Sequence, residues 1–282
     1  MIHRTHGYLT HRPSSEGSLE SQHLEREGYV LLPSVFTQDE ITELASEITQ
    51  VYDEIPADIR MPRHQGGKEM FRYEMLNRSA ACQHALANRG ILDVIEPLLG
   101  EDCHVIANTA WRNPPNKPGL HGGERWHIDA GPHVPLPEGV TWPADIPHPV
   151  FAIGTHIYLQ KCRIEDGPTG VIPGSHLSGQ APPRDRLLDD DLTYSGVGVT
   201  PLLAQPGDVG LFVSDVWHRR MATQPGDQGR FFLQVHYGRR DIAQRLRVTA
   251  EASHLSHDAI ARADSDRSRT LIGLHEPLFY DG

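Results

Sequence analysis

Cysteine is scarce in this chain, and the few cysteines form no motif. Only Cys82, Cys103 and Cys162 occur among the 282 residues, an odd number without any Cys-x-x-Cys spacing. Disulfide-stabilised secreted domains need paired cysteines, and structural zinc sites need closely spaced ones. The sequence therefore predicts neither a disulfide framework nor a structural zinc site, and this usage of cysteine favours a cytoplasmic location.

Long apolar runs, basic tracts and glycine-rich nucleotide motifs are also missing from the sequence. A membrane helix needs about 20 consecutive apolar residues. A net charge of −11 without a basic tract argues against a nucleic-acid surface, and the lack of Rossmann and P-loop motifs argues against a nucleotide cofactor. We therefore expect a small-molecule substrate, with neither nucleic acid nor membrane as a partner, and the sequence leaves the oligomeric state open.

The chain is long enough to bury one substantial core. Residues 1–20 are polar and are broken by Pro13 and Gly17, which indicates a flexible N-terminal leader. The remaining residues, 21–282, have a length that all-β architectures commonly fill as a single domain. We therefore expect a leader followed by one domain.

The order of the predicted elements favours a mainly β fold with helices near its start. A strand is expected over 28–33, and helices are expected over 37–51, which opens with a Thr-x-x-Glu capping box, and over 91–99, where Pro97 can kink or split the helix. From residue 105 onward the chain changes to short apolar runs, which predict strands over 149–159, 170–173, 208–213 and 230–237. Many short strands separated by turn residues are typical of a sandwich or barrel.

One short motif carries candidate metal ligands. In His127-Ile128-Asp129 the two polar side chains are two residues apart, so in an extended strand they leave the same face. His218, about ninety residues later, offers a third ligand from another strand. Two imidazoles and one carboxylate leave several coordination positions free, which suits non-haem Fe(II) and O₂. Because the chain has 18 histidines, the alternative is an ordinary hydrogen-bonded pair that arose by chance.

Several stretches together resemble the phytanoyl-CoA dioxygenase family of Fe(II)/2-oxoglutarate oxygenases. They are His127-Ile128-Asp129, the run from Asp166 to His176, Gly207-Asp208-Val209 before Trp217-His218, Arg230, and an opening over 27–33. The resemblance spans residues 24–237. It implies a double-stranded β-helix, a jelly-roll or cupin-like barrel, with Fe(II), O₂ and the cosubstrate 2-oxoglutarate bound at one open end. It also implies oxidation, most often hydroxylation, of a small metabolite, with decarboxylation of 2-oxoglutarate to succinate.

The resemblance also implies roles for individual residues. His127, Asp129 and His218 would hold the iron and form the catalytic centre. Arg230, twelve residues after His218, stands where the family places the arginine that binds the distal carboxylate of 2-oxoglutarate. A guanidinium suits this task because it meets a carboxylate with two parallel hydrogen bonds, and the alternative is a solvated cation at a strand end. Since halogenating relatives lack the carboxylate, Asp129 favours hydroxylation, desaturation, epoxidation or ring closure.

The sequence departs from the family pattern beside the distal histidine. Members often continue with Gly and then Ser or Thr, whereas here Arg220 occupies the hydroxyl position after His218. Three roles are open for Arg220: a second contact to 2-oxoglutarate, a contact to an anionic substrate, or exposure to solvent. Asn108 and Arg112 share a strand face that leads into the metal loop, and with Thr155 they are further candidates for binding cosubstrate or substrate. Hydrogen bonding at a sheet edge is the alternative for each.

The remaining predictions concern the class of substrate and two alternative functions. Arginines near the expected mouth of the barrel indicate a polar or anionic substrate; they are Arg112, Arg125, Arg219, Arg220, Arg239 and Arg240. His236, on the strand begun by Arg230, is more typical of a hydrogen-bonded core histidine than of a ligand. A metal-dependent cupin-type enzyme without 2-oxoglutarate would have no use for Arg230, and a catalytically silent jelly-roll binding protein would tolerate loss of any ligand.

Overall fold

Six antiparallel strands form the larger sheet of the molecule, in the order β3-β9-β6-β11-β5-β4. The computed structural model describes residues 2–5, 8–11, 17–54, 71–115, 121–129, 131–244 and 255–274. The strands of the larger sheet are β3 Tyr29–Leu32, β4 Phe71–Tyr73, β5 His104–Asn113, β6 Ala152–Tyr158, β9 Val209–Val213 and β11 Arg230–Gly238. A smaller sheet, in the order β10-β7-β8, consists of β7 Thr169–Val171, β8 Thr200–Pro201 and β10 His218–Arg220. Strands are therefore present in all five predicted ranges.

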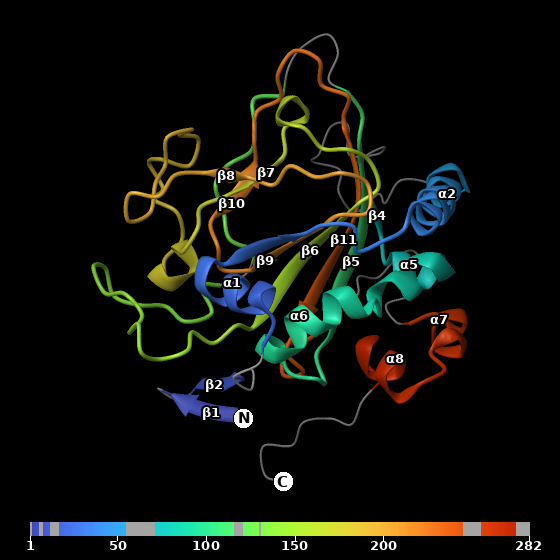
Figure 1. Cartoon of the computed structure of the whole chain (residues 1–282), viewed down its shortest axis with the longest axis horizontal. Coiled ribbons are helices and arrows are strands. Elements are labelled where there is room, and N and C mark those ends of the chain that lie inside the picture. Colours follow the sequence, from blue (N-terminus) through green and yellow to red (C-terminus); the bar gives the residue numbers. More distant parts are fainter. Residues whose placement is uncertain are drawn as a thin grey trace.

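Helices pack on one face of the larger sheet, and the smaller sheet lies on the other side (Figure 1). The helices are α1 Leu19–Glu27, α2 Gln38–Glu54, α4 Met75–Arg78, α5 Ala80–Leu86, α6 Arg89–Leu99, α7 His257–Arg262 and α8 Asp266–Leu271. Ile48 of α2 and Leu92 of α6 belong to the same apolar core as Ile157 of β6. Between the sheets, Phe212 of β9 shares an apolar cluster with Val171 of β7. Both faces of the larger sheet are thus covered.

Local sequence signals explain the two longest helices. At the start of α2 the backbone N–H of Thr37 donates to the Glu40 carboxylate at 2.7 Å, and the backbone N–H of Glu40 donates to the Thr37 hydroxyl at 3.3 Å. At the start of α6 the Asn88 side chain accepts from the backbone N–H of Gly90. Pro97 lies inside α6 without splitting it. Both predicted helices are confirmed.

The described part of the segment expected as a leader, residues 1–20, contains a short hairpin and the start of a helix. Two short strands, β1 Ile2–Thr5 and β2 Tyr8–His11, pair antiparallel from Ile2 opposite His11 to Thr5 opposite Tyr8. The helix α1 then begins at Leu19. Main-chain hydrogen bonds hold such a hairpin together, and the polar composition of the segment does not predict them. The domain boundary at residue 21 stays a prediction.

Strand β11 connects the core to the site because its two faces differ. Leu233, Val235 and Tyr237 belong to the core under the helices. The alternating residues on the other face, which line one cavity, are Arg230, Phe232, Gln234 and His236. The molecule is therefore a mainly β protein with flanking helices, the double-stranded β-helix or jelly-roll that the sequence predicts.

Two further observations concern the cysteines and the apolar helices. All three cysteines are buried and make no disulfide bond. Of the helices in the described ranges, none is both long enough and apolar enough to span a membrane.

Candidate active site

The three predicted metal ligands meet beside strand β10. Two backbone hydrogen bonds of 3.0 Å join His127 to His218, and the backbone N–H of Asp129 donates to the carbonyl of Ser214. Oδ1 of Asp129 lies 3.4 Å from Nε2 of His218 and 3.9 Å from Nε2 of His127. One possible ligand atom from each side chain lies within 4.8 Å of the other two. The three residues can therefore hold one metal ion.

Backbone carbonyls orient both imidazoles. Nδ1 of His127 donates to the carbonyl of Arg125 at 2.9 Å, and Nδ1 of His218 donates to the carbonyl of Val216 at 2.9 Å. Because a carbonyl only accepts, each Nδ1 carries the proton and each Nε2 keeps its lone pair. The donor set offered at this point is thus two imidazole nitrogens and one carboxylate oxygen, which fits iron(II).

The charges of the cluster keep the carboxylate ionised. Although burial opposes ionisation, the charges of His218 and His236 hold the pKa of Asp129 well below its usual range. Burial, followed by the charge of His218, lowers the pKa of His127 and favours the neutral imidazole that a metal needs. The Asp129 carboxylate raises the pKa of His218 although burial acts in the opposite direction. A bound metal ion would take the place of the proton on His218 as the positive charge that faces Asp129.

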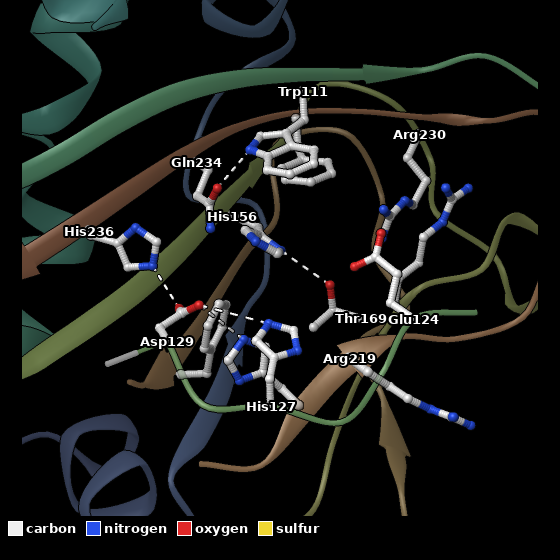
Figure 2. Close-up of a pocket in the computed structure, with 14 residues that line it drawn as sticks. Trp111, Glu124, His127, Asp129, His156, Thr169, Arg219, Arg230, Gln234 and His236 are labelled. Atoms are coloured by element: carbon white, nitrogen blue, oxygen red, sulfur yellow. Dashed lines mark hydrogen bonds and ion pairs between the residues drawn. The ribbon is translucent and has the colours of Figure 1, made fainter. Parts of the chain in front are cut away.

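The candidate ligands line a cavity of about 270 Å³ between the two sheets. Figure 2 shows Asp129 and His236 on one side of this cavity and Arg230 and Glu124 on the other. The rest of the wall includes Trp111, His156, Thr169, Phe212, His218, Arg220, Phe232 and Gln234. One end of the cavity thus offers metal ligands, and the other offers guanidiniums beside the carboxylate of Glu124.

The wall carries buried arginine donors without partners, most of them on Arg220 and Arg230. The guanidinium of Arg220 has Nε and Nη2 buried without a hydrogen-bond acceptor, and that of Arg230 has Nε in the same state. Nη2 of Arg230 donates to Oδ1 of Asn113 at 3.1 Å. Burial, followed by repulsion from Arg230, lowers the pKa of Arg220 to about 10. Among the described residues neither guanidinium lies within ion-pair distance of a carboxylate, so an anionic ligand would supply acceptors for the unpaired donors.

Thr169 and His156 also line the cavity, although neither was among the residues predicted to bind metal or cosubstrate. Thr169 pairs directly with Arg220 across the β7–β10 ladder, and its Oγ1 lies 3.5 Å from Nδ1 of His156. The ring of His156 packs at a tilt against that of Phe232, with centroids 4.3 Å apart, and burial holds the pKa of His156 well below its usual value. Because Arg220 replaces the hydroxyl residue of the family pattern, a hydroxyl residue on a neighbouring strand could have been sought, and Thr169 is such a residue.

Three predicted binding residues lie on the opposite face of the larger sheet. Val235 of β11 pairs with Asn108 on one side and with Thr155 on the other, so the three form a row across the sheet. Val235 belongs to the core under the helices, and this row therefore faces the helices. Arg112 lies two pairs further along the same face, opposite Phe231. Asn108 and Arg112 do share a face, as expected, but it is not the face that lines the cavity.

Their contacts agree with this placement. Oδ1 of Asn108 accepts from the backbone N–H of Leu76 at 2.8 Å, and its Nδ2 donates to the carbonyl of Gln234 at 3.0 Å. The guanidinium of Arg112 lies 4.0 Å from the ring centroid of Tyr52. The sequence could not reveal this arrangement, because alternation shows which residues share a face and not which face is inward.

The other arginines expected near the mouth serve mainly structural contacts. Arg219 forms an ion pair with Asp190 and lies 4.7 Å from the ring centroid of Trp126, and Figure 2 shows it pointing away from the metal ligands. Two further ion pairs join Arg239 to Asp241 and Arg240 to Asp102. Arg219 and Arg220 both line the cavity and both have buried unpaired donors, but Arg219 is already held by the ion pair with Asp190.

His236 is placed differently from a simple core histidine. Its Nε2 lies 2.8 Å from Oδ2 of Asp129, the oxygen that does not face the two candidate histidine ligands. The sequence could have indicated this position, because side chains alternate along a strand and His236, six residues after Arg230, shares the face of Arg230.

Comparisons with known proteins agree with the geometry of the site. The model of the phytanoyl-CoA dioxygenase family matches residues 24–222. Ectoine dioxygenase of Sphingopyxis alaskensis is 26% identical over 217 residues, which are 69% of this chain and 67% of that protein.

Solved structures share the fold. That of EctD from S. alaskensis with bound Fe has a TM-score of 0.63 and 19% identity, with 85% of this chain and 84% of that chain covered. That of the epimerase SnoN in complex with Fe³⁺, alpha ketoglutarate and nogalamycin RO has a TM-score of 0.57 and 18% identity, with 78% and 82% covered.

Proposed function

Because the chain belongs to the phytanoyl-CoA dioxygenase family, we propose that the cavity between its two sheets is the active site of this Fe(II)- and 2-oxoglutarate-dependent oxygenase. The enzyme uses iron and 2-oxoglutarate and acts on a small molecule. One observation carries the assignment of the site: the ligand atoms of the His-Asp-His cluster converge in the same cavity as two buried arginines with unpaired donors.

We assign the iron to His127, Asp129 and His218. Support comes from the convergence of two Nε2 atoms and one carboxylate oxygen, and from the backbone carbonyls that leave both lone pairs free. A catalytically silent binding protein would have no need to keep these three ligand atoms close together. The three ligands leave several coordination positions for cosubstrate and O₂.

We assign the distal carboxylate of 2-oxoglutarate to Arg230, with Arg220 as a second donor. The buried unpaired N–H groups of both guanidiniums support this assignment, because a carboxylate would supply the missing acceptors. A metal enzyme without 2-oxoglutarate would leave the buried donors of both arginines unpaired, which costs free energy even though Glu124 and Asp227 offset part of their charge. The cupin-type alternative is disfavoured for this reason.

When bound, iron and 2-oxoglutarate supply the oxidative chemistry, in which O₂ is reduced, 2-oxoglutarate is decarboxylated to succinate and a C–H bond of the substrate is oxidised. The chain contributes ligation and positioning. The carbonyls of Arg125 and Val216 hold the imidazoles in place, and the aromatic wall around His156 limits the access of water. We propose hydroxylation as the outcome, because Asp129 occupies the position that a halide would need.

The proposed substrate is a small polar or anionic metabolite. Its support is the cavity volume of about 270 Å³, which the cosubstrate must share, and a wall that includes polar side chains such as Thr169 and Gln234. The relatives named for ectoine and nogalamycin act, by their names, on small molecules. Independence of nucleic acid and membranes and a cytoplasmic location stay predictions.

Succinate formation tests the proposal. The protein is incubated aerobically with Fe(II), 2-oxoglutarate and a panel of small polar and anionic metabolites, and succinate is measured. We expect succinate from the unmodified protein and none from His127→Ala, while His84→Ala, which removes an exposed histidine on α5, keeps the activity. Absence of succinate with the whole panel, together with no binding of 2-oxoglutarate by calorimetry, would overturn the proposal.

A further inference from the structure

We infer that His236 is a positioning residue that holds Asp129 as a ligand through one oxygen only. The inference rests on the proposed function, because it assumes that Asp129 binds the iron. It assigns a task to a side chain that neither contacts the proposed cosubstrate anchor nor belongs to the three-ligand cluster.

The two oxygens of Asp129 have separate partners. Oδ1 faces Nε2 of His218 at 3.4 Å and Nε2 of His127 at 3.9 Å. Oδ2 accepts from Nε2 of His236 at 2.8 Å. An ionised carboxylate only accepts, so the hydrogen bond requires the proton of His236 to be on Nε2. One oxygen is therefore presented to the ligand cluster, and the other is held away from it.

The donor is fixed in the middle of the larger sheet. His236 lies on β11, where its backbone pairs with Ala107 on one side and with Gly154 on the other. Asp129, by contrast, lies outside the named strands, and its backbone N–H bonds to the carbonyl of Ser214. The side-chain bond thus ties a ligand on a connecting segment to the most central part of the fold.

This geometry bears on how many coordination positions remain free. A carboxylate can bind a metal through one oxygen or through two, and a second bound oxygen would occupy a position that cosubstrate or O₂ needs. Because Oδ2 is engaged by His236, it is unavailable to the metal. Hydrogen bonds from neighbours to ligating groups typically change metal affinity or activity by about 10- to 100-fold when removed.

The experiment compares variants of His236 that keep or lose the donor. His236→Gln places an amide N–H near the position of Nε2, whereas His236→Leu and His236→Met have no donor. His84→Gln removes an exposed imidazole on α5 and controls for the loss of any histidine. Co(II) serves as the probe, its dissociation constant is measured by calorimetry, and its visible absorption spectrum reports the coordination of the ion. Melting of the metal-free proteins identifies variants that fail to fold.

We expect the Leu and Met variants to bind Co(II) about 10- to 100-fold more weakly, with a changed spectrum, and the Gln and His84 variants to stay within about threefold of the unmodified protein. If a folded Leu or Met variant binds Co(II) with unchanged affinity and spectrum, the inference is wrong. Equal losses in the Gln, Leu and Met variants would also overturn it, because the hydrogen bond would not be the cause. If the unmodified protein binds no Co(II), the proposed iron site itself fails.

Discussion

Arg220 lies directly opposite Thr169 in the antiparallel pairing of β10 with β7, and both side chains line the cavity that holds the candidate metal ligands. Directly paired residues of an antiparallel ladder share one face of the sheet. A hydroxyl therefore stands beside position 220, although it comes from the neighbouring strand. The family pattern of a hydroxyl after the distal histidine is replaced here by an arginine and a threonine facing the same space.

We predict that the Thr169 hydroxyl, which lines the cavity beside Arg220, donates to the distal carboxylate of 2-oxoglutarate, so that Thr169→Val weakens the binding of 2-oxoglutarate by about 3- to 10-fold while keeping the shape of the side chain. Calorimetry with the Co(II)-loaded protein measures the effect. Thr155→Val is the matched control, since Thr155 is fully buried on the face toward the helices, and its affinity for 2-oxoglutarate should not change. Equal effects of the two substitutions would contradict the placement of the Thr169 hydroxyl.

Arg230→Ala should weaken 2-oxoglutarate binding by about 100-fold, because the main charged partner of the distal carboxylate is removed. Arg220→Ala should weaken it by about tenfold, since one guanidinium remains. Arg112→Ala serves as the control, because its guanidinium stacks on Tyr52 and not in this cavity. If Arg220→Ala leaves 2-oxoglutarate binding unchanged but raises the KM for the substrate, Arg220 recognises the substrate instead.

Asn108→Ala should destabilise the fold without affecting the cosubstrate. The Asn108 side chain satisfies the backbone N–H of Leu76 and the carbonyl of Gln234, and removing it leaves buried polar groups unpaired. We expect the free energy of unfolding to fall by about 1 to 3 kcal/mol in urea titrations of the metal-free protein. A loss of 2-oxoglutarate affinity at unchanged stability would speak for a binding role of Asn108.

His148 should make the fold sensitive to acid. Its ring is buried, 5.2 Å from the Trp142 ring and 5.5 Å from that of His176, and burial, followed by the charge of His176, lowers its pKa to about 3 from 6.5. Below pH 6.5 the unfolded chain therefore takes up a proton that the folded chain takes up only near pH 3. Stability from this group is present above pH 6.5 and is lost as pH falls towards 3.

The variant His148→Phe keeps an aromatic ring and removes the titrating group. The free energy of unfolding is measured in urea at pH 7 and pH 5 for both metal-free proteins. The loss between these two conditions should be smaller in the variant by about 2 kcal/mol. An identical loss in both proteins would show that His148 does not resist protonation in the folded state.

Much of the site could be predicted because short motifs need no long-range information. The spacing of His127 and Asp129 predicted two ligands on one face of an extended segment, and Arg230 opens an apolar strand. The structure brings the first two together with His218 and places Arg230 in the same cavity. The helix over 37–51 carried its own capping signal, which acts within a few residues, and the helix over 91–99 was predicted from its apolar run.

Asn108 and Thr155 show where prediction from sequence stops. Alternation along a strand makes Asn108 and Arg112 share a face, but both faces of the larger sheet are buried, so apolar pattern does not say which one is the cavity. His236 was interpreted as a core histidine for the same reason, although it contacts Asp129.

The sequence by itself determined which residue types can ligate a metal and bind a carboxylate, the order of strands and helices, and the capping of α2 and α6. These are properties of neighbours in the chain. Only the tertiary structure decided that Thr169 faces Arg220 and that His236 reaches Asp129, since these pairs are separated by 51 and 107 residues. Contacts of this kind depend on the register of paired strands and on how the two sheets pack, and both are set by the whole chain.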